Sequence, residues 1–188
     1  MQSFNPSRFS APARVAQLFL FVIVALLCAG MLSGCATSAV HSKPGTATTV
    51  IMLRHADVEE KTPLLSEAGH ARARALVDAV KGMPITAIYS PDLQRNIDTV
   101  TPLARERGLE ITLTPLVSVL VAKDIAQEMV TKHAGGTVVY VGNASGNLQS
   151  VYWHLGGSGT GPVSYGDLYI MSVPDKGEAK VVKKRFGY

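Results

Sequence analysis

Apolar and polar positions follow two alternating periods along the chain from Thr48 onward. Short runs rich in β-branched and aromatic residues predict buried strands, and segments with apolar residues at helical spacing predict helices between them. Strands are predicted at residues 49–55, 85–91, 109–115 and 137–142. Helices are predicted at residues 66–82, 92–108, 122–136 and 147–157. A closing hairpin is predicted within residues 167–187, with its turn at Pro174–Gly177.

Caps and breakers give the expected helix boundaries. Ser66 is a suitable N-cap for the first helix, and Gly82 is a suitable stop. Pro102 predicts a kink or a local break in the second helix, and Asp124 is expected to cap the third. The small and apolar residues of the first helix that fall near helical spacing are Ala68, Ala71, Ala75, Leu76 and Ala79.

The alternation of strand and helix predicts the fold class. Four repeats indicate an α/β fold with a mostly parallel central sheet, helices on both faces and the last hairpin at an edge. Ligands of such sheets bind beyond the carboxyl ends of the strands. The residues to consider are therefore Arg54 and His55, the segment Ser90–Arg95, and the small-residue loop Asn143–Gly146.

The N-terminal segment has the pattern of an export signal. Two arginines precede an apolar run at residues 18–32, which is shorter than a membrane-spanning helix requires. The sequence LSGC that ends at Cys35 resembles the lipobox of bacterial lipoproteins, which implies cleavage before Cys35 and lipidation of that residue. An ordinary signal peptide or a single anchoring helix is the alternative. We expect a lipoprotein signal at residues 1–34, a flexible tether at 35–47 and a folded domain at 48–188.

The lipid anchor implies a place in the cell. By analogy with lipoprotein sorting in bacteria with two membranes, Ala36 after the cysteine favours the outer membrane, with the domain facing the periplasm. Removing residues 1–34 takes away two of the 18 basic residues and none of the 14 acidic ones, which leaves a net charge of +2. This bias is too weak to indicate nucleic acid as a partner. Cys35 is the one cysteine left, so the mature domain has no internal disulfide.

The residues at the strand ends are suited to an oxyanion. A neutral imidazole at His55 is a competent nucleophile or base, and Arg54 beside it can hold an anion. Arg95 lies early in a predicted helix, where the backbone amides already favour negative charge. Each of these residues alone is as readily a solvated polar side chain. Together with Asn143 at the same sheet edge, they predict a phosphate site.

Several segments resemble the histidine phosphatase superfamily, in its phosphoglycerate mutase-like branch. VIMLRHAD is similar to the RHG signature, and IYSPDLQRNIDTVTPLARERGLEI is similar to the helix with the pattern SSxxxRxxQT. The similarity continues through VVYVGNASGNLQSVYWHLGG. It implies a phosphoglycerate mutase-like fold and a phosphohistidine at His55, with Arg54 and Arg95 binding the phosphoryl oxygens. Thr62 and Ser145 are candidate additional donors, and neither a cofactor nor a metal is expected.

The sequence departs from the family pattern at the end of the fourth strand. The family has GH there and this chain has GN, so Asn143 stands where the second histidine of the pocket is expected. An amide donates a hydrogen bond but carries no charge. A charged hydrogen bond is worth roughly 1.5–3 kcal/mol against about 1 for a neutral one, so the exchange costs about ten-fold or more in rate.

A general acid is also missing from the expected segment. Residues 114–123 contain no carboxylate, and Asp57, Glu59 and Glu60 are expected to be solvated loop charges. The histidines at 70, 133 and 154 lie on predicted helices away from the strand ends.

Three functions are therefore open: a histidine phosphatase with impaired activity, a non-catalytic protein that binds a phosphorylated ligand, and a structural lipoprotein. The phosphate-site residues argue against the third. The expected partners are a phosphorylated small molecule or phosphoprotein and, through the lipid, the membrane.

Overall fold

The computed structural model describes residues 39–115 and 119–187. The predicted signal peptide and the predicted lipidation site at Cys35 lie outside these residues. None of the helices in the described ranges is long and apolar enough to cross a membrane.

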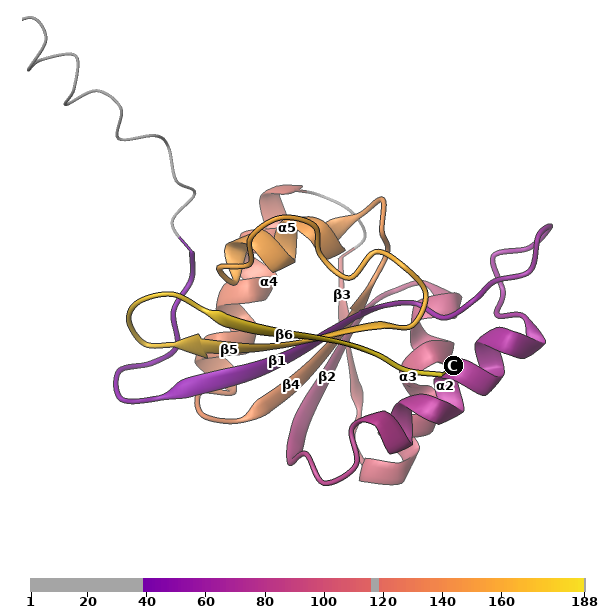
Figure 1. The fold of residues 1–188 in the computed structure, drawn as a ribbon, viewed down its shortest axis with the longest axis horizontal. Helices are drawn as coiled ribbons and strands as arrows, with labels where there is room; N and C mark the ends of the chain where they lie inside the picture. The colour runs from indigo at the N-terminus through magenta and orange to yellow at the C-terminus, as the bar shows by residue number, and fades with distance from the viewer. Residues whose placement is uncertain (1–38, 116–118, 188) are drawn as a thin grey trace, which may run out of the picture. The chain divides into compact units, whose positions relative to one another are not determined.

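One six-stranded sheet organises the described domain (Figure 1), in the order β3-β2-β4-β1-β5-β6. The strands are β1 (Ala47–Arg54), β2 (Ile85–Pro91), β3 (Ile111–Thr114), β4 (Thr137–Gly142), β5 (Asp167–Pro174) and β6 (Lys180–Arg185). The helices are α2 (Glu67–Ala79), α3 (Gln94–Arg107), α4 (Val119–Lys132) and α5 (Asn147–His154). The first four strands pair in parallel, and β5 and β6 are antiparallel additions at one side. The predicted mixed α/β fold with an edge hairpin is confirmed.

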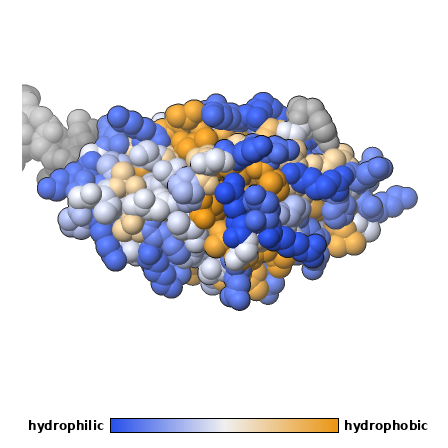
Figure 2. Space-filling view, turned by 90° about the horizontal axis from the view of Figure 1, so that it is seen from below, coloured by the Kyte–Doolittle hydropathy of each residue, from blue (hydrophilic) through white to orange (hydrophobic). Residues whose placement is uncertain are grey.

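Helices cover both faces of the sheet. In Figure 1, α4 and α5 lie above the strands and α2 and α3 lie below them. Because successive side chains of a strand point to opposite faces, β1 supplies Ile51 and Leu53 to the core under α2 and α3, and Val50 and Met52 to the core under α4 and α5. All four side chains are fully buried. Figure 2, seen from below, shows mostly hydrophilic side chains around smaller apolar areas.

Two expectations about helices are wrong in detail. Leu76, one of the residues at helical spacing, is buried on α2, but the rest of its buried side consists of Gly69, Arg72 and Ala73, which that spacing did not indicate. The sequence pattern missed it because an arginine lies in the middle of the buried side. Asp124 lies inside α4 and does not cap it, since the helix already begins at Val119.

The N-cap at Ser66 is confirmed: its hydroxyl accepts a hydrogen bond from the Gly69 amide. Pro102 lies inside α3, which is not broken there.

The predicted tether is also too long at its C-terminal side. Val40 is 4% exposed and its amide donates to the carbonyl of His154. Ser42 is buried as well, and its hydroxyl oxygen accepts from the Thr48 amide at 3.0 Å and lies 2.7 Å from the carbonyl oxygen of Val173. Residues 40–46 therefore belong to the folded domain, because they bury an apolar side chain and satisfy backbone groups beside β1 and β5.

We expect Ser42→Ala to lower the free energy of unfolding by about 1–3 kcal/mol, because it leaves the buried Thr48 amide without its acceptor. Urea denaturation of the full chain followed by circular dichroism measures the loss. The exposed neighbour Lys43 provides the control, and Lys43→Ala is expected to change the value by less than about 0.5 kcal/mol. Equal stabilities of the two variants would show that this segment does not contribute to the fold.

Candidate active site

A pocket of about 300 Å³ lies at the carboxyl ends of the parallel strands. The parallel pairing of β1 with β4 places Arg54 opposite Gly142, and the His55 amide donates to the Gly142 carbonyl at 3.0 Å. Arg54 at the end of β1, His55 directly after it and Asn143 directly after β4 therefore face the same space. The pocket is lined by Arg54, His55, Val58, Pro63, Arg95, Asn143, Ala144, Ser145 and Tyr165. All four residues predicted to handle phosphate are among them.

The orientation of His55 is fixed by its neighbours. The side chain is 4% exposed, and Nδ1 lies 2.8 Å from the carbonyl oxygen of Ala56. Because a carbonyl only accepts, Nδ1 carries the proton, and Nε2 keeps its lone pair. The Ala56 amide in turn donates to the Thr99 hydroxyl at 2.8 Å, which holds this backbone against α3. The imidazole is therefore presented in the tautomer that a nucleophile at Nε2 requires.

Burial keeps the His55 imidazole neutral. Desolvation lowers its pKa from the ordinary 6.5 to about 4, against the opposing effect of the hydrogen bond to Ala56. The positive charges of Arg54 and Arg95 contribute to this lowering. At neutral pH the imidazole is therefore neutral, with the lone pair of Nε2 available to attack an electrophile.

The two arginines differ in how much of each guanidinium is free. Arg95 uses Nε to donate to Asn143 Oδ1 at 3.0 Å, and its two terminal nitrogens have no hydrogen-bond partner among the described residues. Arg54 donates from one terminal nitrogen to the Val163 carbonyl at 2.9 Å and from the other to the Tyr165 hydroxyl at 3.2 Å. Its guanidinium carbon lies 4.0 Å from the centre of the Tyr165 ring. Arg95 thus offers a free fork to an anion, and Arg54 is more tightly held.

Asn143 acts on Arg95 in this arrangement. The residue is 7% exposed, and its Oδ1 accepts the hydrogen bond from Arg95 Nε. This uses the acceptor end of the amide, while its donor end has no partner in the described part of the chain. A protonated imidazole could not accept this bond. Asn143 therefore holds the Arg95 guanidinium through Nε and leaves the two terminal nitrogens of Arg95 available.

The loop after His55 is fastened by a partly buried ion pair. Arg72 Nε lies 2.6 Å from Asp57 Oδ2, and the side chains of Arg72 and Asp57 are 8% and 24% exposed. The same guanidinium donates to the carbonyls of Phe186 and Gly187. The hydrogen bond from Arg72 holds the pKa of Asp57 below its ordinary value. Asp57 is therefore an ionised structural anchor and is not available as a proton donor. The expectation that Asp57 is a solvated loop charge is wrong, because Arg72 binds it in a partly buried ion pair.

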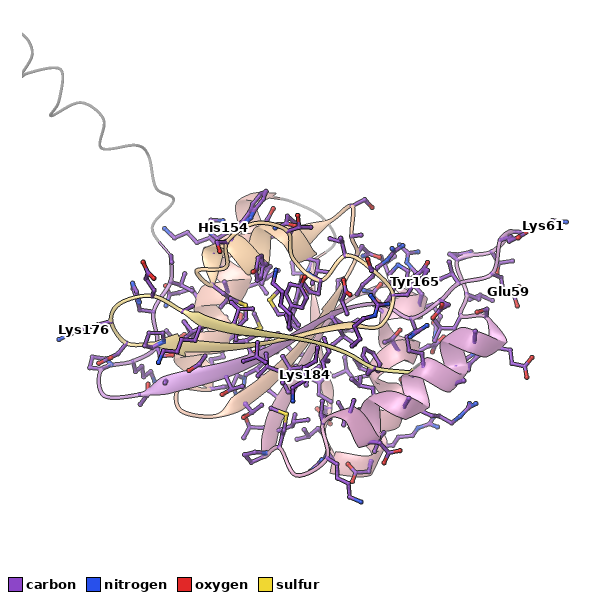
Figure 3. All side chains as sticks on the ribbon, viewed as in Figure 1. Glu59, Lys61, His154, Tyr165, Lys176 and Lys184 are labelled. Carbon is purple, nitrogen blue, oxygen red and sulfur yellow. The ribbon has the colours of Figure 1, made fainter. Side chains whose placement is uncertain are left out.

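The other candidates from the sequence fall into two groups. Ser145 lines the pocket, whereas Thr62 is exposed and does not. Glu59 and Glu60 are exposed as expected, and Figure 3 shows Glu59 and Lys61 toward the outer end of their loop, beyond Tyr165. The histidines at 70, 133 and 154 do not line the pocket either. No carboxylate in the described ranges lines it.

Sequence reasoning missed Tyr165 and the apolar wall of Val58 and Pro63. Tyr165 comes from the connection between α5 and β5, where neither a helical nor a strand period indicates a position in space. Its ring meets that of His55 edge to face, with the centres 5.7 Å apart. The one available signal was an aromatic residue in a glycine-rich loop that returns to the sheet beside β1.

Fold and pocket together define a class of protein. The six-stranded sheet and four described helices form the fold of phosphoglycerate mutase-like histidine phosphatases. Residues 46–117 match the family described as Histidine phosphatase superfamily (branch 1), a segment that includes Arg54, His55 and Arg95 and ends before Asn143. No curated protein matches the chain in sequence.

Solved structures with the same fold were found at low sequence identity. The protein histidine phosphatase SixA, complexed with tungstate, is 15% identical with a TM-score of 0.57, over 73% of this chain and 96% of that one. Phosphoglycerate mutase from Bacillus anthracis is 15% identical with a TM-score of 0.53, over 76% and 93%. YhfR from Bacillus stearothermophilus is 17% identical with a TM-score of 0.51, over 72% and 95%. The family match and these structures support a histidine phosphatase superfamily domain.

We expect the His55 imidazole to titrate near pH 4 in the folded chain. An unfolded chain binds this proton near pH 6.5, so the stability that depends on neutral His55 is present above about pH 6.5 and is lost as the pH falls toward 4. NMR of the imidazole protons measures the midpoint, with the His55 signal assigned by its loss in His55→Asn. A midpoint close to 6.5 would show that the ring is solvated and not held in the pocket.

Proposed function

We propose that this protein is a membrane-tethered histidine phosphatase that hydrolyses phosphomonoesters slowly through a phosphohistidine at His55. The observation that carries the proposal is the buried, neutral His55, with Nε2 unprotonated, in one pocket with Arg54 and Arg95. A nucleophile and two cations in one pocket are what phosphoryl transfer requires, because catalysis of this reaction consists mostly of positioning and charge stabilisation.

In the proposed reaction, Nε2 attacks phosphorus and the bond to the leaving oxygen breaks. The hydrogen bond from Nδ1 to the Ala56 carbonyl stabilises the positive charge that develops on the ring. The free fork of Arg95 is suited to two phosphoryl oxygens at once. A water molecule then attacks the phosphohistidine, which releases phosphate and restores His55.

Two features support a low rate. Asn143 stands where the resemblance places a second histidine, so a neutral amide takes the position of a charged donor. No carboxylate among the described residues lines the pocket to protonate a leaving group. Both features weaken catalysis more than they weaken phosphate binding, since the arginines remain.

A binding function is the second candidate, and the bond between Asn143 and Arg95 favours it. This bond fixes the guanidinium in place before any ligand arrives. A pocket with a fixed anion clamp and no acid suits a protein that retains a phosphorylated ligand without turning it over.

The tether is part of the same proposal. The signal pattern and Cys35 support a lipoprotein of the bacterial envelope, with the domain on the periplasmic side of the outer membrane. The described domain begins at Ala39, shortly after Cys35, and Val40 is already packed in it. A lipid on Cys35 would therefore hold the folded domain to the membrane through a short segment. The ligand in this proposal is a phosphorylated small molecule or phosphoprotein.

We expect the full chain in detergent to hydrolyse 4-nitrophenyl phosphate, and His55→Ala to abolish the activity because it removes the nucleophile. Asn143→His is expected to raise kcat by about ten-fold, as a charged donor replaces a neutral one. Release of inorganic phosphate is the measurement. Activity that survives in His55→Ala would rule out the phosphohistidine. Turnover that appears only in Asn143→His would establish the binding function instead.

Binding by the arginine fork gives a separate expectation. Millimolar phosphate or vanadate should raise the Tm of the full chain, and Arg95→Gln should remove most of this shift because it takes away the fork. Arg105→Gln is the matched control, since Arg105 is an exposed arginine on the same helix. The Tm shift is read by differential scanning fluorimetry. An equal shift in both variants would place the anion outside this pocket.

A further inference from the structure

Tyr165 lines the pocket, and its hydroxyl has no part in the function proposed above. We propose that Tyr165 donates the proton that the leaving oxygen takes as its bond to phosphorus breaks. The role rests on the proposed phosphatase reaction and supplies the group which that reaction lacks, a general acid.

The backbone around Tyr165 is held firmly. The Tyr165 carbonyl accepts a hydrogen bond from Arg185 at 2.9 Å, and the Phe186 amide donates to the Gly166 carbonyl at 2.9 Å. Both bonds join the end of the loop to β6 and the residue after it. Figure 3 shows Tyr165 at the end of the sheet where the pocket lies, beside the connection that leads into β5. A fixed backbone lets the ring form one wall of the pocket.

The phenol has its proton free. The Tyr165 oxygen accepts from a terminal nitrogen of Arg54 at 3.2 Å, so it is an acceptor in that bond. Within residues 39–115 and 119–187, no acceptor receives the phenolic proton. Tyr165 is half-buried and lines the pocket, where an occupant can take that proton. The Tyr165 ring also contacts the His55 ring, with their centres 5.7 Å apart, so the two residues lie side by side in the pocket.

The other groups near His55 are less suited to this task. Asp57 does not line the pocket, and it is ionised and paired with Arg72. Ser145 has an exposed aliphatic hydroxyl, which gives up a proton less readily than a phenol. The phenolate left on Tyr165 would lie against the guanidinium of Arg54, which stabilises negative charge at that oxygen. The hydrogen bonds that fix Arg54 therefore also keep its positive charge beside the Tyr165 oxygen.

The step balances as follows. Nε2 of His55 forms a bond to phosphorus, the bond to the ester oxygen breaks, and that oxygen takes the proton of Tyr165 and leaves as a neutral alcohol. Water then attacks the phosphohistidine and gives its proton to the phenolate. The products are the alcohol and inorganic phosphate, and His55 and Tyr165 return to their first states.

The test compares two leaving groups. Ethyl phosphate releases a strongly basic alkoxide and depends on an acid, whereas 4-nitrophenyl phosphate releases a stable anion and does not. For the full chain in detergent, we expect Tyr165→Phe to lower kcat for ethyl phosphate by about 100-fold and kcat for 4-nitrophenyl phosphate by less than about three-fold. Tyr169→Phe is the matched control, since Tyr169 lies on β5 and does not line the pocket. It should leave both rates unchanged.

Each other outcome has a definite meaning. Equal losses on both substrates in Tyr165→Phe would show a structural role and overturn the proposal, and so would unchanged rates. Hydrolysis of 4-nitrophenyl phosphate without any hydrolysis of ethyl phosphate by the unmodified chain would also overturn it, while the proposed phosphatase function stands. Hydrolysis of neither substrate, or activity retained in His55→Ala, would overturn the phosphatase function and the role of Tyr165 with it.

Discussion

The site depends on one backbone hydrogen bond, from the His55 amide to the Gly142 carbonyl. It joins the residue after β1 to the last residue of β4 and continues the parallel register in which Arg54 pairs with Gly142. The residues after the two strands, His55 and Asn143, consequently lie at the same edge. Because a shift of one residue would turn every side chain of β1 to the opposite face, the two buried cores protect this register. Core packing and site geometry are therefore enforced by the same pairing.

A second constraint fixes the chain immediately after His55. Gly69 in the first turn of α2 approaches the carbonyl of Asp57 so closely that a Cβ at this position would overlap it. Arg72, one turn further, holds the Asp57 carboxylate and the last carbonyls of the described chain. Loss of either partner of this partly buried pair would leave the other charge partly desolvated and without its counter-ion, which destabilises the fold. Helix α2 thus connects the loop after His55 to Phe186 and Gly187.

The sequence predicted the fold well because its signals were local and repeated. Strand and helix periods gave the order of the elements, and the rule that ligands bind at the carboxyl ends of parallel strands predicted that Arg54, His55, Arg95 and Asn143 lie together. The predictions that were wrong or incomplete share a cause: contacts between residues far apart in sequence outweighed the local sequence pattern. The buried side of α2 contains Arg72, whose charge is neutralised by a residue far away in sequence. The position of Tyr165 in the pocket could not be predicted, because Tyr165 lies in a loop whose sequence has no helical or strand periodicity.

The electrostatics of the pocket separate two tasks that a phosphatase must perform. Two guanidinium groups beside a desolvated imidazole favour its neutral form, which is the form that attacks phosphorus. The same positive charges oppose protonation of the second ring nitrogen of His55, so the imidazole has no additional proton to donate. Asn143 cannot supply one, and Asp57, in the loop after His55, is held ionised by Arg72. In the proposed reaction, the proton for the leaving group would therefore have to come from a neutral donor.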